Sequence, residues 1–443
     1  MVNQPMSRIL LLGTLFFVVL LGGLATFNAG WLALTLPLAI YLLWGFLSAP
    51  ENINLSVERT LSAERVAPGQ TVVVALRITN HGSAIGQLLL RDPLPDFIKV
   101  NDGSSHRLVS LRHGESLAWK YSFTGQRGFH TFKIIEAAAS DPLGLLTMRR
   151  SLDTSGQIMV LPMAPRVKRV VIRTRVTRIY SGNIPARLDG SGVDFLGLRE
   201  YQPGDSLRII NWRVSARYPQ ALFSNEYEQE RAADVGIILD ARLQVNRLGT
   251  NLTLFEHSIL AAAALSNAFL ASGNRVGLLI YGQYINWTIP AYGKLQRERI
   301  SQALACAAPG DNQAFTSMYI PSRLFPANSQ LVFVSPLQTD DVQPLLRLRA
   351  RGYALIVICP NAVRFEMDLM SKTNLSQSKQ AETMRQAARI LAMRRHITLQ
   401  RLRHAGVQIV DWDVKQPFEK VAESALSRPP TFMRAIGAVG SRQ

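Results

Sequence analysis

The N-terminal part of the chain contains a long stretch without formal charge, since no Asp, Glu, Lys or Arg occurs between Arg8 and Glu51. Within this stretch, the apolar run 9–27 is long enough to cross a bilayer core of roughly 30 Å, and the run 31–47 is nearly long enough. Uncharged runs of this length are typical of membrane-spanning helices. We therefore predict a transmembrane helical hairpin over residues 1–49, which would hold the chain in the lipid bilayer.

The charge next to the first apolar run predicts the orientation of this hairpin. A hairpin places both of its ends on one side of the membrane, and Arg8 with the terminal amine favours the cytoplasmic side. We therefore expect a two-pass protein of the inner (cytoplasmic) membrane whose soluble domains lie in the cytoplasm. The alternative is a signal peptide that ends near residues 23–25. No polar cleavage region follows that point, and the second apolar run begins within a few residues.

Residues 50–162 show the pattern of short strands joined by tight turns. Val72, Val74, Leu76 and Ile78 alternate with other residues, and turns rich in Gly, Asn and Asp recur between the apolar segments. Alternation of this kind predicts strands with one buried face. The segment is therefore expected to form a small Ig-like β-sandwich of roughly a hundred residues.

Residues 235–428 change to alternating buried strands and amphipathic helices. This alternation predicts an α/β doubly wound, Rossmann-like domain with a mostly parallel sheet and helices on both faces. The strand that starts at Ile285 follows its predecessor after a hairpin-length turn, so we expect it to be a single antiparallel edge. Strands are expected at 235–239, 275–281, 285–289, 330–334, 354–359 and 407–410, and helices at 254–271, 295–307, 341–351 and 379–404. Residues 429–443 are expected to form a loose tail.

The net charge of +18 at pH 7 implies attraction to polyanions. The candidates are nucleic acid, anionic lipid and an acidic protein face, and the predicted membrane anchor favours the last two. No aromatic stacking platform or recognition motif for nucleic acid is evident. Solvated faces are the alternative explanation of the charge. It is concentrated in two basic stretches, one with Arg166, Lys168, Arg169, Arg173, Arg175 and Arg178, the other with Arg385, Arg389, Arg394, Arg395, Arg401 and Arg403.

Residues 163–234 are expected to form a basic connecting segment, because they are rich in Arg and lack a long apolar period. Asp205 is expected to cap a short helix that runs through Arg217. The segment also contains a distinctive string of residues. It consists of Gly192-Val193-Asp194-Phe195, Leu198-Arg199-Glu200-Tyr201-Gln202-Pro203-Gly204-Asp205, Arg208, Asn211-Trp212, Ser215-Ala216-Arg217 and Glu226-Tyr227-Glu228-Gln229-Glu230-Arg231.

This string resembles the domain-of-unknown-function family fifty-eight. The resemblance implies a von Willebrand A-like domain at residues 235–428 and a MoxR-type AAA+ ATPase as partner, and it implies no known reaction. Six residues of the string form either a catalytic cluster or, as we favour, an ion-paired elbow between two domains, with Trp212 as a core anchor. They are Arg199, Glu200, Asp205, Arg208, Trp212 and Arg217. Asn211 stands where Asp is usual, which removes a carboxylate from the motif. The signature positions are Arg199, Tyr201, Pro203, Gly204, Asp205, Arg208, Asn211, Trp212, Arg217 and Glu230.

The resemblance also allows a test for a metal site. In von Willebrand A-like domains, oxygen ligands from an Asp-x-Ser-x-Ser motif, a Thr in a second loop and an Asp after the fourth strand hold a divalent cation. Here Arg242 and Gln244 interrupt the motif that begins at Asp240, and Ser335 replaces the last Asp. Thr316 and Asp311 could still line the second loop, but these oxygens are too few for a cation. We therefore predict a degenerate site without a metal or another cofactor. Arg242 either pairs with Asp240 inside the protein or reaches a carboxylate of a partner.

These residues would share the face at the carboxyl ends of the strands, where doubly wound sheets bind ligands. We therefore take this face as the best candidate for a binding surface. The sequence contains no GxxxxGK[ST], HExxH, CxxC or GxSxG motif, and Cys306 and Cys359 lie in apolar stretches. We expect an adaptor and not an enzyme, acting with the ATPase in assembly or maturation of envelope proteins. The alternatives are a membrane-associated hydrolase that uses the signature Asp, Arg and Ser residues, and a polyanion-binding protein.

Overall fold

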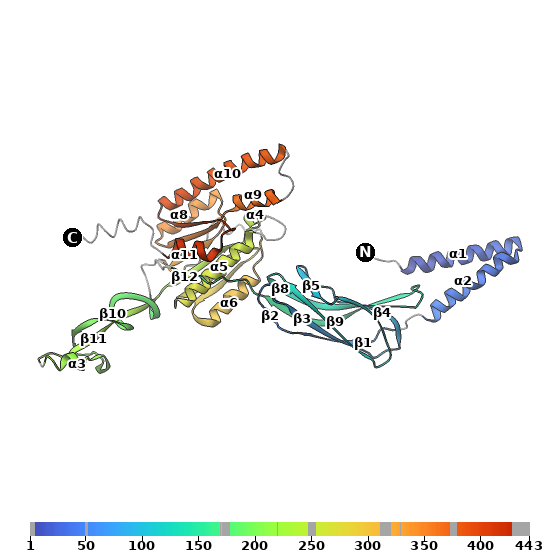
Figure 1. The fold of residues 1–443 in the computed structure, drawn as a ribbon, viewed down its shortest axis with the longest axis horizontal. Coiled ribbons are helices and arrows are strands. Elements are labelled where there is room, and N and C mark those ends of the chain that lie inside the picture. The colour runs from blue at the N-terminus through green and yellow to red at the C-terminus, as the bar shows by residue number, and fades with distance from the viewer. Residues whose placement is uncertain are drawn as a thin grey trace. The chain divides into compact units, whose positions relative to one another are not determined.

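A computed structural model describes residues 5–48, 52–168, 170, 178–218, 220–246, 254–310, 320–327, 329–372 and 379–427 of the chain. The chain divides into two compact units, Met1–Leu161 and Pro162–Gln443. Each unit is described by itself (Figure 1). The predicted tail at 429–443 and the predicted site residue Thr316 lie outside the described residues.

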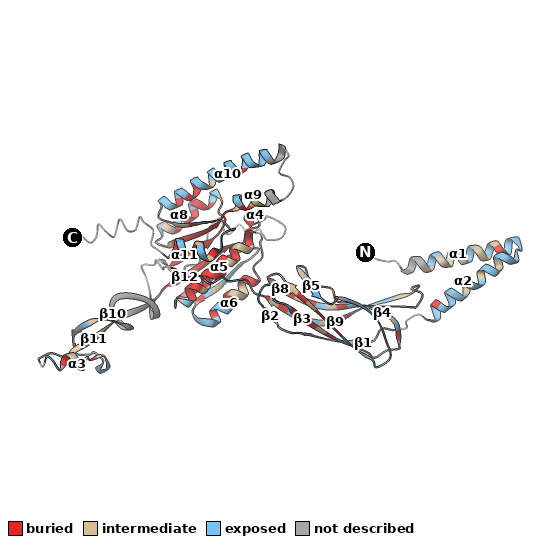
Figure 2. Cartoon of the chain, in the orientation of Figure 1, coloured by how far each residue is buried: buried red, intermediate tan, exposed pale blue. Residues whose placement is uncertain are grey.

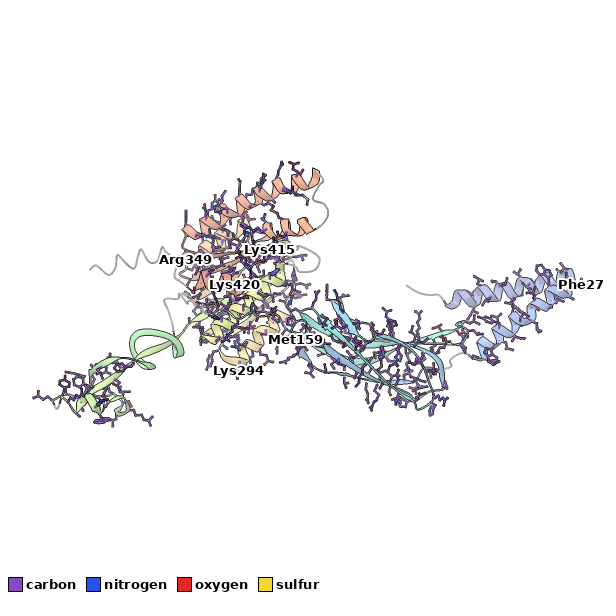
Figure 3. All side chains as sticks on the ribbon, in the orientation of Figure 1. Phe27, Met159, Lys294, Arg349, Lys415 and Lys420 are labelled. Atoms are coloured by element: carbon purple, nitrogen blue, oxygen red, sulfur yellow. The ribbon has the colours of Figure 1, made fainter. Side chains whose placement is uncertain are left out.

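The first unit begins with two apolar helices, α1 (Pro5–Thr26) and α2 (Ala29–Leu47). Asn28 begins α2 by accepting a hydrogen bond from the Gly30 amide at 2.9 Å. Phe27, at the turn between the helices, is 94% exposed (Figure 3). Only 6% of the apolar window in α1 and 11% of that in α2 are buried within the protein. Both helices are long and apolar enough to span a membrane, and their bare apolar surface suits lipid.

The rest of the first unit consists of two β-sheets that share one core. The four-stranded sheet has the order β1 (Leu55–Leu61), β3 (Val72–Asn80), β7 (Ser116–Gly125) and β5 (Ile98–Asp102). The five-stranded sheet has the order β2 (Arg65–Val66), β9 (Thr147–Val160), β8 (Gly128–Ser140), β4 (Ile85–Arg91) and β6 (His106–Leu111).

Alternating burial explains why these strands form two layers. In β3 the residues at 72, 74, 76 and 78 are buried, as their alternation in the sequence predicted. Phe123 of β7 meets Phe132 of β8 with ring centroids 5.7 Å apart, which joins the two sheets across the core.

The second unit contains a six-stranded sheet with the order β14-β13-β12-β15-β16-β17. Its strands are β12 (Asp234–Asp240), β13 (Arg275–Tyr281), β14 (Ile285–Ala291), β15 (Gln330–Val334), β16 (Ala354–Pro360) and β17 (Gln408–Trp412). Neighbouring strands pair in parallel except at the edge, where β14 is antiparallel to β13. The single antiparallel edge predicted at Ile285 is therefore confirmed.

Helices cover both faces of this sheet. Helices α5 (Leu254–Ala271), α6 (Gly293–Ala305) and α11 (Phe418–Leu426) pack on one face. Helices α8 (Val342–Ala350) and α10 (Lys379–His404) pack on the other. The central strands β12 and β15 are buried along their whole length, whereas much of α10 is exposed (Figure 2). Two short helices, α9 (Ala362–Lys372) and α11, were not predicted, because each is only a few turns long.

The prediction of a plain connecting segment before this domain was wrong. Residues 178–232 contain two long antiparallel strands, β10 (Arg178–Glu200) and β11 (Phe223–Ala232). Between them lie a 3₁₀ turn, η1 (Leu207–Ile209), and the short helix α3 (Trp212–Ser215). A two-stranded ribbon need not bury a full face, so its sequence lacks the apolar alternation that marks core strands.

The helix predicted after Asp205 is also different in the structure. Ser206 begins η1, and the Asn211 side chain accepts a hydrogen bond from the Val214 amide to begin α3. Asp205 caps neither element. It binds Arg199 instead, because the chain folds back between the two strands.

Candidate functional site

The carboxyl ends of β12 and β15 meet at the point where the chain order of the sheet reverses. From β12 the next strand in the chain, β13, lies on one side, and β15 lies on the other. Asp240 ends β12, and Ser335 follows β15 one residue beyond the paired Leu239 and Val334. This point is the usual ligand-binding position of a doubly wound sheet. The structure thus brings Asp240, Arg242 and Ser335 together.

The Arg242 guanidinium occupies the space between two carboxylates. Its Nε and Nη2 donate to the two Asp240 oxygens at 3.0 and 2.8 Å. Its Nη1 and Nη2 donate to the two oxygens of Asp341 at 3.1 and 2.8 Å. Ser335 Oγ donates to Asp240 Oδ2 at 2.6 Å. We name Asp240, Arg242, Ser335 and Asp341 the buried ionic cluster.

The buried ionic cluster is closed to solvent. Asp240 and Ser335 are fully buried, Asp341 is 1% exposed, and Arg242 is 6% exposed. Burial disfavours the charge on Arg242, but the hydrogen bonds that it donates to Asp240 and Asp341, with the attraction of their charges, outweigh that effect and raise its pKa above its ordinary value. Of the two alternatives left open for Arg242, contact with a carboxylate of a partner is not what this burial allows. The alternative, internal pairing with Asp240, is what the structure shows.

Asp341 was not recognised as a member of this site. It lies at the end of the 3₁₀ turn η2 (Thr339–Asp341), and its Oδ2 also accepts the Gln338 amide at 2.7 Å. In the sequence, Asp340 and Asp341 look like the acidic residues that commonly begin a helix. That interpretation gives no sign that Asp341 also binds Arg242. Only the tertiary fold brings Asp341 to Arg242.

The residues present do not fit a divalent cation. The carboxylate oxygens that would coordinate a metal already accept hydrogen bonds from Arg242, and a cation there would face the guanidinium charge directly. Gln244, the remaining described position of the degenerate motif, is exposed and lies outside the buried ionic cluster.

A cavity of ≈ 550 Å³ lies beside the buried ionic cluster. Gln244, Leu337, Glu366 and Leu391 are among the residues that line it. Leu337 has a φ of 59°, a conformation that costs energy for a residue other than Gly, and its amide donates to Ser335 Oγ at 3.0 Å. Burial raises the pKa of Glu366. The binding face predicted from the sequence therefore has a recess next to the cluster.

Arg395 also lines this recess. Its guanidinium donates to the Pro336 carbonyl at 2.8 Å and to Asp411 Oδ1 at 2.8 Å. It also contacts the sulfur of Cys359 at 3.1 Å, and burial raises the pKa of that thiol to about 11. Arg395 is thus part of the fold, not of a solvated basic face. Cys306, predicted to lie in a buried stretch, is exposed.

The signature residues gather at the end of the β10–β11 ribbon, in residues 198–226, which we name the signature tip. Arg199 Nη1 and Nη2 donate to the two Asp205 oxygens at 2.7 Å each. Arg199 Nε lies 3.1 Å from Glu226 Oε1. Asn211 Nδ2 donates to Asn225 Oδ1 at 2.8 Å, which ties α3 to β11. The predicted ion-paired arrangement is present, and it stabilises the tip itself.

Several apolar side chains of the signature tip are exposed to solvent. Trp212 is 64% exposed, so the expectation that it anchors a core was wrong. Leu207 is 68% exposed, Tyr218 59% and Leu222 45%. The tip is too small to enclose a tryptophan. The other signature positions support the turn or lie on its surface. Tyr201 OH donates to the Asp205 carbonyl at 3.4 Å, and Pro203 and Gly204 form the turn before Asp205. Arg208 and Arg217 are exposed, and Glu230 lies in β11.

The Asp205 carboxylate predicts a pH dependence for the signature tip. The hydrogen bonds from Arg199 are the main cause that lowers the pKa of Asp205 from 3.8 to about 2. Because the pKa of Asp205 is lower in the folded tip than in the unfolded chain, the ion pair stabilises the tip fully at pH values above the ordinary pKa of 3.8. This stabilisation is lost as the pH falls through the folded-state pKa of about 2. We expect hydrogen-exchange protection factors of residues 198–226 to stay constant down to the ordinary pKa and to fall below it.

The control for this prediction is Asp205→Asn, which retains the shape but not the charge. Its tip should be poorly protected at neutral pH, and the protection should change little over the same acid range. A wild-type tip whose protection is lost well above the ordinary pKa of a carboxyl would contradict the pairing with Arg199.

These features define a chain with two apolar helices suited to a membrane, followed by a body of several sheets with mixed α and β structure. The family model described as "Protein of unknown function DUF58" matches residues 197–406, which include most of the signature tip and of the α/β domain. Over residues 197–406 the chain is similar to this family.

One curated relative is the "Uncharacterized protein YeaD" of Bacillus subtilis (strain 168), which is 27% identical over 203 residues. That match covers 45% of this chain and 48% of the relative, so the chain spans about half the length of the relative. Among solved structures, the CARDB domain of the PF1109 protein from Pyrococcus furiosus is 16% identical, with 25% of this chain and 91% of that chain covered at a TM-score of 0.18. A FixG-related protein from Vibrio parahaemolyticus is 13% identical, with 25% and 98% covered at a TM-score of 0.17. At these TM-scores, neither structure supports an argument about this chain.

Proposed function

We propose that this protein is a membrane-anchored adaptor that acts with a MoxR-type AAA+ ATPase in assembly or maturation of envelope proteins. In this proposal the two-sheet domain is Ig-like, the α/β domain is von Willebrand A-like, and neither carries out a reaction of its own. The observation that carries the proposal is the signature tip, which exposes aromatic, leucine and arginine side chains on a locally ordered support.

The composition of the signature tip supports a role in protein binding. Trp, Tyr and Arg are the residues most enriched among the energetic hot spots of protein interfaces. Trp212, Leu207 and Tyr218 would supply the apolar centre of such an interface. Arg208, Arg213 and Arg217 are exposed and pair with no carboxylate among the described residues, so they favour an acidic partner surface.

The state of the polar signature residues disfavours the hydrolase alternative. Asp205 is bound on both oxygens by Arg199, which lowers its pKa and makes it a poor base. Ser215 Oγ accepts a hydrogen bond from the Phe223 amide at 2.9 Å and so supports the turn. In the described part of the signature tip, no His approaches this hydroxyl to activate it.

Co-purification from detergent-solubilised membranes tests the proposed function. The full-length chain carrying an affinity tag should recover an AAA+ ATPase, identified by mass spectrometry, and a chain of unrelated sequence with two membrane spans serves as the control. Failure to recover any ATPase from cells that express one of this class would contradict the proposal. Recovery of nucleic acid instead, with salt-sensitive binding, would favour polyanion binding.

The proposal includes a cytoplasmic orientation of the soluble domains. Two membrane spans place both termini on one side, and Arg8 favours the cytoplasm. A reporter that is active only in the cytoplasm, fused after Gln443, should therefore be active, and a reporter that requires export should be inactive. The opposite pattern would contradict the orientation and with it access to a cytoplasmic ATPase.

A further inference from the structure

The outward face of α10 carries an apolar ridge. Ile390 is 55% exposed, Met393 69% and Ile397 51%. Their spacing of three and four residues aligns them along one side of the helix. The opposite side is buried, where Ala388 and Leu402 lie against the domain. Figure 2 shows most of the surface of α10 as exposed. The ridge thus adds nothing to the core of its own domain.

Arginines flank this ridge on both sides. At about 100° per residue, Arg389 lies on one side of the ridge, and Arg394 and Arg401 lie on the other. All three are exposed, and none pairs with a carboxylate among the described residues. The helix contains one acidic residue, Glu382. An apolar stripe with cations on both sides is the pattern of a helix that lies in a membrane interface.

We propose that the outward face of α10 binds the surface of a bilayer that contains anionic phospholipid. The apolar ridge would enter the boundary between headgroups and acyl chains, and the flanking guanidinium groups would bind the lipid phosphates. An acidic protein would satisfy the arginines alone. The ridge between them, and the two membrane spans of this same chain, favour lipid.

The membrane spans raise the effective concentration of lipid headgroups that the rest of the chain meets. A chain held in the bilayer by α1 and α2 meets lipid headgroups without a free diffusional encounter, so a weak interfacial contact becomes populated. The inference depends on the membrane anchor but not on the ATPase partner. Its test uses vesicles and not co-purification, so failure of one proposal is distinguishable from failure of the other.

Lipid quenching in vesicles tests the inference with the full-length chain. A fluorophore is placed on Met393→Cys in a Cys306→Ser background, because Cys359 is fully buried. The control site is Tyr284→Cys, which is 78% exposed on the edge hairpin of the sheet. With lipids brominated in the acyl chain, we expect strong quenching at 393 in vesicles of phosphatidylcholine and phosphatidylglycerol, and weak quenching at 284. Pure phosphatidylcholine, or added salt, should reduce the signal at 393.

Two variants separate the contributions of charge and ridge. The charge reversal Arg389→Glu, Arg394→Glu and Arg401→Glu, and the ridge change Ile390→Asp with Ile397→Asp, should each reduce quenching at 393 to the level at 284. Both sets of side chains are exposed, so melting should be unchanged. Weak quenching at 393 in both kinds of vesicle, or equal quenching at 284, would overturn the proposal. Equal quenching at 393 with and without anionic lipid would overturn the part assigned to the net negative charge of the lipid.

Discussion

Arg242→Ala is expected to destabilise the α/β domain by about 3–5 kcal/mol, the usual cost of removing one partner from a buried ion pair. The change leaves Asp240 and Asp341 buried without their shared cation. Each carboxylate must then be protonated, bind water or leave the interior. The measurement is the melting transition of the α/β domain in the detergent-solubilised full-length chain, followed by calorimetry. The first unit provides an internal reference, since its transition should not move.

The matched control is Arg364→Ala. Like Arg242, Arg364 forms an ion pair, here with the single carboxylate of Asp413 at 3.2 Å, but its side chain is 65% exposed. Solvent screening reduces such a pair to about 1 kcal/mol or less. A chain in which Asp240→Asn and Asp341→Asn accompany Arg242→Met should recover much of the stability, because no buried charge then remains. An Arg242→Ala chain that melts like wild type would show that the cluster is open to water.

The vacated space in Arg242→Ala should also respond to divalent cations. Two carboxylates and the Ser335 hydroxyl would then surround a small cavity with oxygen atoms, which is the donor set that Mg²⁺ and Mn²⁺ prefer. We expect either ion to raise the melting temperature of the variant, since a ligand that binds only the folded state stabilises it. The wild-type domain should show no such response. A stabilisation of the wild type that Asp240→Ala abolishes would contradict the role of Arg242 as the resident cation.

The second large effect is expected at the signature tip. Leu207→Asp combined with Trp212→Asp should abolish recovery of the ATPase partner, because loss of a central aromatic anchor costs about 2–4 kcal/mol of binding and a desolvated carboxylate adds to it. Both side chains are largely exposed, so the fold should persist. Recovery is measured by quantitative mass spectrometry of tagged chains purified from equal amounts of membrane.

The control for the tip is a matched change elsewhere on the α/β domain. Tyr284 and Trp287 are 78% and 56% exposed on the edge hairpin β13–β14. Tyr284→Asp with Trp287→Asp likewise replaces two exposed bulky side chains, one of them a tryptophan, by carboxylates and should leave recovery unchanged. Equal recovery of the partner by the tip variant and by wild type would assign the contact to another surface.

The sequence by itself determined the elements whose pattern is local. The uncharged run between Arg8 and Glu51 predicted two helices suited to a membrane, and two such helices are present. Short apolar runs and helical apolar periods of three to four residues identified most strands and helices of the α/β domain, and a period of two identified β3 of the first unit. The short turn before Ile285 predicted the antiparallel edge. Each of these signals arises between residues close in the chain, where burial of one face imposes a repeat.

Only the tertiary structure decided how the charged and aromatic residues are used. Asp341 lies 99 residues from Arg242, and no local pattern announces that they meet. Arg395, one of several similar arginines in the sequence, binds inward, whereas Arg394 beside it faces solvent. Trp212 is of a residue type that is usually buried, but it remains exposed because the ribbon that carries it encloses too little volume. Burial and pairing depend on which distant segments converge, and that convergence is a property of the folded chain.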